Sequence, residues 1–74
     1  MRLKRLSVSE LMAKPALSIR ELAFVLDLSM PFIYRMFQNG VGPDTFYIGR
    51  VRYVRTATLL AWLAERERLA RAKS

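Results

Sequence analysis

The stretch SIRELAFVLDLSMPFIYRMFQNG, residues 18–40, decides the fold, because it carries the signals for two short helices joined by a tight turn. Ser18 and Glu21 have the spacing of a capping box, in which the serine oxygen accepts a backbone N–H and the glutamate reaches back to the serine N–H. A helix is therefore predicted to begin after Ser18. Its apolar residues recur at helical spacing and form a core-facing stripe of Ile19, Leu22, Ala23 and Leu26.

A second helix is predicted directly after the first. Ser29 can cap it, Pro31 falls in its first turn, where a missing N–H costs nothing, and Gly40 offers a left-handed residue at its end. Only Asp27 and Leu28 remain to turn the chain, so the stretch predicts a helix-turn-helix. The inward positions of this second helix are Ile33, Met36 and Phe37.

Two apolar residues of the first helix, Phe24 and Val25, do not fit its core stripe. A small surface that exposes a phenylalanine beside a valine is a liability, so another element is expected to cover them. A local cover, from residues 7–14 or from the C-terminal helix, is favoured over a second copy of the chain.

Length and composition set limits on the function. The chain has 74 residues, 53% of them apolar, which supports one small domain with one core. Thirteen Lys and Arg against six Asp and Glu give a formal charge of +7, which favours polyanions, nucleic acid before acidic membrane. The absence of cysteine and histidine removes disulfides, thiolate nucleophiles and ordinary zinc sites. We therefore expect no catalytic residues, no cofactor and no metal.

No targeting segment is evident in the sequence. No apolar run approaches the roughly 18 residues of a membrane helix, and the basic start MRLKRL is not followed by an uninterrupted hydrophobic region. The expectation is a cytoplasmic protein, associated with the bacterial nucleoid if it binds DNA.

Three segments are predicted. Residues 1–17 form a basic arm and a short helix that begins with a second capping box, Ser7 and Glu10, and ends at Pro15. Residues 18–64 form the helix-turn-helix domain, and residues 65–74 form a charged helical tail that could also pair two copies through Leu69 and Ala70.

A cationic hairpin is predicted between the second helix and the last one. Residues 45–48 and 51–54 are rich in β-branched and aromatic residues and flank a glycine-containing turn. Arginines beside a helix-turn-helix suit a wing that lies on phosphates or enters the minor groove, although charge on an edge hairpin also blocks aggregation. The arginines of this wing are Arg50, Arg52 and Arg55.

The last helix is predicted to close the domain. Thr56 or Thr58 can cap it, and Leu59, Trp62 and Leu63 share one of its faces. Trp62 is therefore expected to anchor the core and not to stack on a base.

The outward face of the second helix is the candidate reading surface. Arg35 can fork onto guanine or a phosphate, Gln38 can pair with adenine, and Tyr34 can reach a phosphate with its hydroxyl. These three are also ordinary surface residues, and it is the helix pair and the net charge that favour a DNA contact. The predicted recognition-helix contacts are Ser29, Met30, Pro31, Tyr34, Arg35 and Gln38.

This order of elements resembles the excisionase and AlpA-type small DNA-binding proteins, which are related to the DNA-binding domains of the MerR superfamily. The resemblance rests on SIRELAFVLDLS, IYR, Gly40, Pro43, IGR and LLAWL, within residues 18–63. It implies a mostly helical winged helix-turn-helix with a small two-stranded hairpin, and a sequence-specific binder of double-stranded DNA without catalytic activity. Such proteins act in excision or transcriptional control of prophages and mobile elements.

The resemblance also implies how the DNA is contacted. The second helix would enter the major groove, and Arg50 and Arg52 would reach the backbone or minor groove from the wing. Family members usually carry polar or basic residues where Met30, Pro31 and Phe32 stand, so this first turn is expected to touch thymine methyls instead.

Partners other than DNA follow from the same reasoning. A single short helix reads only a few base pairs, so a homodimer or cooperative assembly on DNA is expected, and a site-specific recombinase or RNA polymerase is a candidate protein partner. The alternative is a protein-interaction module that binds an integrase, polymerase or toxin through a surface of Phe24, Met30 and Phe32.

Overall fold

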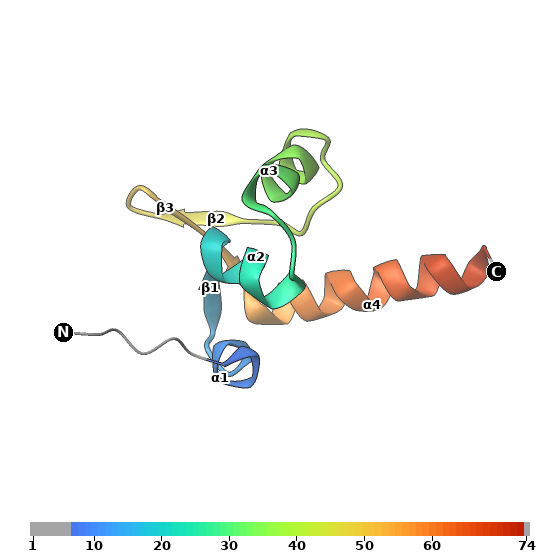
Figure 1. The fold of residues 1–74 in the computed structure, drawn as a ribbon, viewed down its shortest axis with the longest axis horizontal. Helices are drawn as coiled ribbons and strands as arrows, with labels where there is room; N and C mark the ends of the chain where they lie inside the picture. The colour runs from blue at the N-terminus through green and yellow to red at the C-terminus, as the bar shows by residue number, and fades with distance from the viewer. Residues whose placement is uncertain (1–6, 74) are drawn as a thin grey trace.

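The computed structural model describes residues 7–73 and combines a small antiparallel sheet with helices that pack around it (Figure 1). The predicted basic arm at residues 1–6 lies outside the described residues. Within residues 7–73 the elements are α1 (Val8–Met12), β1 (Ala16–Ser18), α2 (Ile19–Leu26), α3 (Met30–Gln38), β2 (Phe46–Ile48), β3 (Val51–Arg55) and α4 (Thr56–Ala72).

Both predicted capping boxes are present. The Ser18 Oγ accepts from the Glu21 N–H at 3.2 Å, and a Glu21 carboxylate oxygen accepts from the Ser18 N–H at 2.9 Å. Ser7 and Glu10 repeat this reciprocal pair at the start of α1, with the same two distances. The sequence therefore predicted correctly where α1 and α2 begin.

The turn between α2 and α3 is also as predicted. Asp27 adopts the left-handed conformation with φ 56°, and the Leu28 N–H donates back to the Ala23 carbonyl at 3.0 Å. The Ser29 Oγ then accepts from the Phe32 N–H at 3.3 Å, which caps α3.

The end of α3 is a Schellman motif built on Gly40. Gly40 has φ 70°, its N–H donates to the Phe37 carbonyl, and the Val41 N–H donates to the Met36 carbonyl, both at 3.1 Å. The prediction that Gly40 ends this helix is confirmed.

The sheet has three strands within the described chain, so the prediction of a two-stranded hairpin alone was wrong. The hairpin is present, but β1 pairs antiparallel with β3, in the order β1-β3-β2, with Leu17 opposite Val54. β1 is only three residues long, between Pro15 and the capping serine of α2, and its partner lies far along the chain. Local patterning carries no signal for such a pairing.

The same contact corrects the predicted cap of α4. This helix begins after Arg55 without a side-chain capping bond, so neither Thr56 nor Thr58 caps it. Instead, the buried Thr56 donates its hydroxyl to the Lys14 carbonyl and its N–H to the Pro15 carbonyl. Thr56 therefore ties the start of α4 to the chain just before β1.

The core lies where the sheet meets the helices. Its fully buried side chains come from five elements: Leu17, Leu22, Ile33, Val54 and Leu59. Trp62 packs partly buried against this core and donates from its Nε1 to the Val41 carbonyl at 3.0 Å. The predicted anchoring role of Trp62 is thereby confirmed, and it also fixes the loop after α3.

The prediction that another element covers Phe24 and Val25 was half right. Val25 packs partly buried against the core, on the side of α2 where Lys14 pairs with Glu21. Phe24, the residue directly before Val25, remains 41% exposed, so the cover extends over Val25 but not over Phe24.

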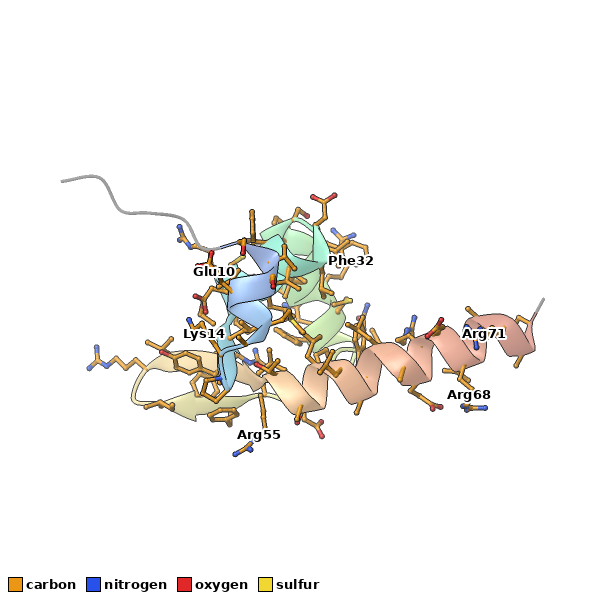
Figure 2. All side chains as sticks on the ribbon, turned by 90° about the horizontal axis from the view of Figure 1, so that it is seen from below. Glu10, Lys14, Phe32, Arg55, Arg68 and Arg71 are labelled. Atoms are coloured by element: carbon orange, nitrogen blue, oxygen red, sulfur yellow. The ribbon has the colours of Figure 1, made fainter. Side chains whose placement is uncertain are left out.

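The second half of α4 projects from the body (Figures 1 and 2). The residues from Ala64 to Lys73 are all exposed, so the helix extends beyond the core that supports its first turns. The hairpin and this projecting half lie at opposite ends of the molecule (Figure 1).

Candidate nucleic-acid interface

α3 presents a polar face away from the core. Ile33 is fully buried, and Arg35 and Gln38 are exposed on the side opposite it. Pro31 lies on the same outward side, one turn before Arg35. The outward orientation predicted for these residues is therefore observed, whereas the Ser29 hydroxyl oxygen is engaged in capping the helix.

Met30 and Phe32 lie on different flanks of α3. Met30 is half-buried and packs against the core, whereas Phe32 is 45% exposed. Residues two apart in a helix do not face each other, so these two do not form one apolar patch. On α3, the apolar residues named for the alternative function are therefore divided between two flanks, with Phe32 exposed and Met30 half-buried.

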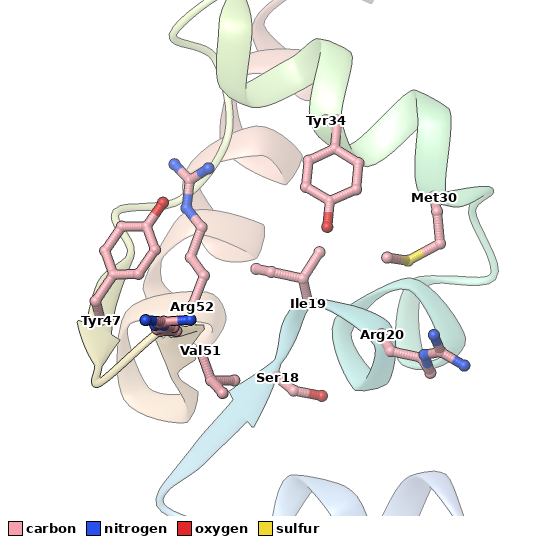
Figure 3. Close-up of a pocket in the computed structure, with 9 residues that line it drawn as sticks. Ser18, Ile19, Arg20, Met30, Tyr34, Tyr47, Val51 and Arg52 are labelled. Atoms are coloured by element: carbon pink, nitrogen blue, oxygen red, sulfur yellow. The ribbon is translucent and has the colours of Figure 1, made fainter.

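A groove of about 510 Å³ separates α3 from the hairpin (Figure 3). Three of its lining residues are arginines and none is a carboxylate. Figure 3 shows Tyr34 pointing from α3 into the groove toward Ile19. The start of α2, α3 and the hairpin supply the lining residues Ser18, Ile19, Arg20, Met30, Tyr34, Tyr47, Arg50, Val51 and Arg52.

Arg52 fastens the hairpin to α3. Its guanidinium carbon lies 4.3 Å from the centre of the Phe37 ring and 5.8 Å from that of Tyr47. Its Nε donates to the Thr45 Oγ1 at 2.8 Å. These contacts leave Arg52 half-buried, so this residue has a structural role that its sequence position did not reveal.

Gly42 makes room for this arrangement. A Cβ at this position would lie 2.8 Å from the Phe37 ring, closer than side chains pack. Glycine is therefore required here, because it lets the loop after α3 pass directly under the ring on which Arg52 stacks.

The other two arginines predicted for a wing occupy different places. Arg50 sits at the tip of the hairpin, in a two-residue turn whose first residue, Gly49, has the positive φ of 63° that a type II′ turn requires. Arg55 is exposed at the opposite end of β3, where it pairs with Ala16 and lies near the start of α4 (Figure 2). The structure brings Arg50 and Arg52 to the groove but not Arg55.

Sequence reasoning missed Arg20. It follows the capped Ile19 on α2, is exposed, and lines the groove. Its position off the core stripe of that helix was visible in the sequence. What was not visible is that the hairpin folds back to border the same groove.

The carboxylate nearest to Arg20 in sequence is occupied elsewhere. Burial raises the pKa of Glu21, but hydrogen bonds from the Lys14 Nζ at 2.6 Å and the Ser18 N–H at 2.9 Å outweigh it, so the pKa lies below the usual value. Within residues 7–73, the ion pairs join Lys14 to Glu21, Arg68 to Glu65 and Arg71 to Glu67. The arginines of the groove and of α3 take part in none of these pairs.

Comparisons with family models, curated proteins and solved structures find no match for this chain. No helix in residues 7–73 is long and apolar enough to cross a membrane. The described residues also contain no cluster of three or more histidine, cysteine, aspartate or glutamate side chains that could hold a metal ion.

Proposed function

We propose that this chain is a sequence-specific double-stranded DNA-binding protein of the excisionase and AlpA type, a winged helix-turn-helix with α3 in the major groove and the hairpin as its wing. The observation that carries the proposal is the groove between α3 and the hairpin, which is lined by three arginines and no carboxylate. Clefts lined by one sign of charge attract ligands of the opposite sign, and a DNA strand is the polyanion that a protruding helix and hairpin fit.

Each contact follows from the side chain and its place. Arg35 and Gln38, exposed on the outward face of α3, are the candidates for base edges, because guanidinium and amide groups match guanine and adenine in the major groove. Pro31 and Met30 offer apolar contact to thymine methyls. Arg50 at the hairpin tip contacts the backbone or minor groove, and Arg52 positions the hairpin for it.

The biological role follows from the type of protein. We propose that it acts in excision or transcriptional control of a prophage or mobile element on the bacterial nucleoid, and that it has no catalytic activity. A helix of nine residues reads only a few base pairs, so specificity requires cooperative loading or a dimer. A recombinase or RNA polymerase would then act beside it on the same DNA.

A salt titration tests the proposal. Fluorescence anisotropy with a random duplex at low salt should give micromolar binding, because this electrostatic contact does not depend on sequence. If about five phosphates are neutralised, log K should fall with log salt with a slope of roughly −4 to −5. Footprinting on the DNA upstream of the protein's own coding sequence would then locate a specific site. Failure to bind any duplex at low salt would reject the proposal and favour the protein-interaction alternative.

A further inference from the structure

We propose that the groove is a binding site for a DNA phosphodiester, held by Arg20, Tyr34 and Arg50, so that one backbone strand runs between α3 and the hairpin. This inference rests on the proposed function. It assigns a DNA contact to Arg20 of α2, which belongs neither to the recognition helix nor to the wing.

The three groups come from three different segments of the chain that border the same groove. Arg20 lies at the start of α2, Tyr34 in the middle of α3 and Arg50 at the hairpin tip, and all three line the same space of about 510 Å³. Two guanidinium groups and a phenol supply donors from different directions. A phosphodiester presents two charged oxygens that accept such donors, and charge-assisted bonds from arginine are the strongest of this kind.

The charges around the groove leave Arg20 and Arg50 available to an anion. Neither forms an ion pair within residues 7–73, and the neighbouring Glu21 is bonded to Lys14 and to the helix cap. Arg52, the third arginine, is already held by Phe37 and Thr45. Arg20 and Arg50 are therefore the cations whose donors can turn to a ligand.

The position of Arg20 favours the backbone over the bases. It lies on the first helix of the pair, whereas the base-reading face of α3 is the outward side with Arg35 and Gln38. In helix-turn-helix proteins the second helix enters the groove and the first crosses the backbone. A phosphate contact from Arg20 would fix the register of α3 without reading sequence.

Two substitutions test this site. Arg20→Ala should weaken specific and random duplexes by the same factor, about 5- to 10-fold, and make the salt slope shallower by about 1. Arg20→Lys keeps the charge and should restore the slope while recovering only part of the affinity. Arg71→Ala removes the same charge from the projecting half of α4 and should change affinity less than about 2-fold.

A modified duplex links the loss to one phosphate. Replacing single phosphates of the specific site by neutral methylphosphonates should reveal a position that weakens the unchanged protein but not Arg20→Ala, because that variant has already lost the contact. Circular dichroism confirms that the exposed substitution leaves the fold intact, and Arg20→Gln serves if it does not.

The failures are distinguishable. If Arg20→Ala keeps the affinity and slope of the unchanged protein, the phosphate site is wrong while the proposed function stands. The site is also wrong if the variant loses only specific binding, since this would place Arg20 on a base. If the unchanged protein binds no duplex, the proposed function itself falls.

Discussion

The groove and the projecting half of α4 are both rich in arginine, but the arginines of the two regions have different neighbours. In the groove, Arg20, Arg50 and Arg52 face no carboxylate. On α4, Arg68 lies 2.6 Å from Glu65 and Arg71 lies 2.8 Å from Glu67, at the helical spacings of three and four residues. Arg66 and Lys73 near the end of α4 lie outside these two pairs, so the groove differs in that its unpaired arginines come from both α2 and the hairpin.

This difference shows why net charge alone does not locate a binding surface. Pairs of opposite charge one turn apart stabilise an exposed helix and keep it soluble. A helix that extends beyond the hydrophobic core needs this support. Arginines that stack on rings or have no carboxylate beside them keep a positive electrostatic potential that can attract an anionic ligand. The following predictions test whether the two regions differ in function as they differ in pairing.

The largest effect is expected from Arg35, the exposed arginine on the outward face of α3. Arg35→Ala should cost about 1–3 kcal/mol of binding to the specific site and relax the preference at one base pair. Anisotropy against a panel of single-base variants of the site measures both. Arg50→Ala is the matched comparison, since it should weaken all sequences alike. Equal losses on specific and random duplexes for both variants would remove the division between reading and positioning arginines.

A somewhat smaller effect, on stability, is expected from Arg52. Arg52→Ala removes the stacking on Phe37 and the bond to Thr45 and should lower the free energy of unfolding by about 1–2 kcal/mol. Arg52→Lys keeps the charge without the planar group, so it should retain the salt slope of DNA binding and still lose most of this stability. Urea denaturation measures the stability. An unchanged midpoint in both variants would mean that the hairpin does not depend on this contact.

The sequence predicted those parts of the fold that depend on neighbours in the chain. Ser18 with Glu21, Ser29 and Gly40 act within one helical turn, so their residue types sufficed to place α2 and α3. The pairing of β1 with β3 and the stacking of Arg52 on Phe37 join residues far apart in sequence. The sequence predicted a DNA contact for Arg55 and none for Arg20, but it is Arg20 that lines the groove. The reason is the same, since only the folded hairpin decides which arginines border the groove beside α3.

A still smaller effect concerns the ion pair that keeps Glu21 away from the groove. Glu21→Gln retains a group that can complete the capping box but loses the charge that pairs with Lys14, so it should cost about 0.5 kcal/mol near neutral pH. Because the folded-state pKa of Glu21 is lowered, its contribution is present above the unfolded pKa and is lost as the pH falls through the folded value.

Unfolding measured from neutral to acidic pH separates this contribution from others. The unchanged protein should lose stability on acidification, and Glu21→Gln should lose less. Glu10→Gln is the control, since Glu10 has the same capping geometry and a pKa lowered by the hydrogen bond from the Ser7 N–H, but within residues 7–73 it has no ion pair with a lysine. Identical pH profiles for the unchanged protein and Glu21→Gln would show that the Lys14 pair does not stabilise the fold.

The smallest effect is expected from Glu65, and it separates pairing from position as the cause of the difference between the two regions. The hydrogen bond from Arg68 lowers the pKa of Glu65, so the carboxylate is ionised and paired near neutral pH. Glu65→Gln releases Arg68 and raises the net charge by one.

Two outcomes of this substitution are distinguishable. If ion pairing alone keeps the projecting half of α4 from binding DNA, the affinity for random duplex should rise and the salt slope should steepen by up to about 1. We instead expect less than a 2-fold change in affinity and an unaltered slope. The projecting half of α4 lies at the end of the molecule opposite the hairpin (Figure 1). Salt limits the field of an exposed charge to about 10 Å at 0.1 M. A steeper slope would mean that the projecting half of α4 lies against the duplex. Its glutamates, and not its position, would then explain why it contributes less to DNA binding than the groove.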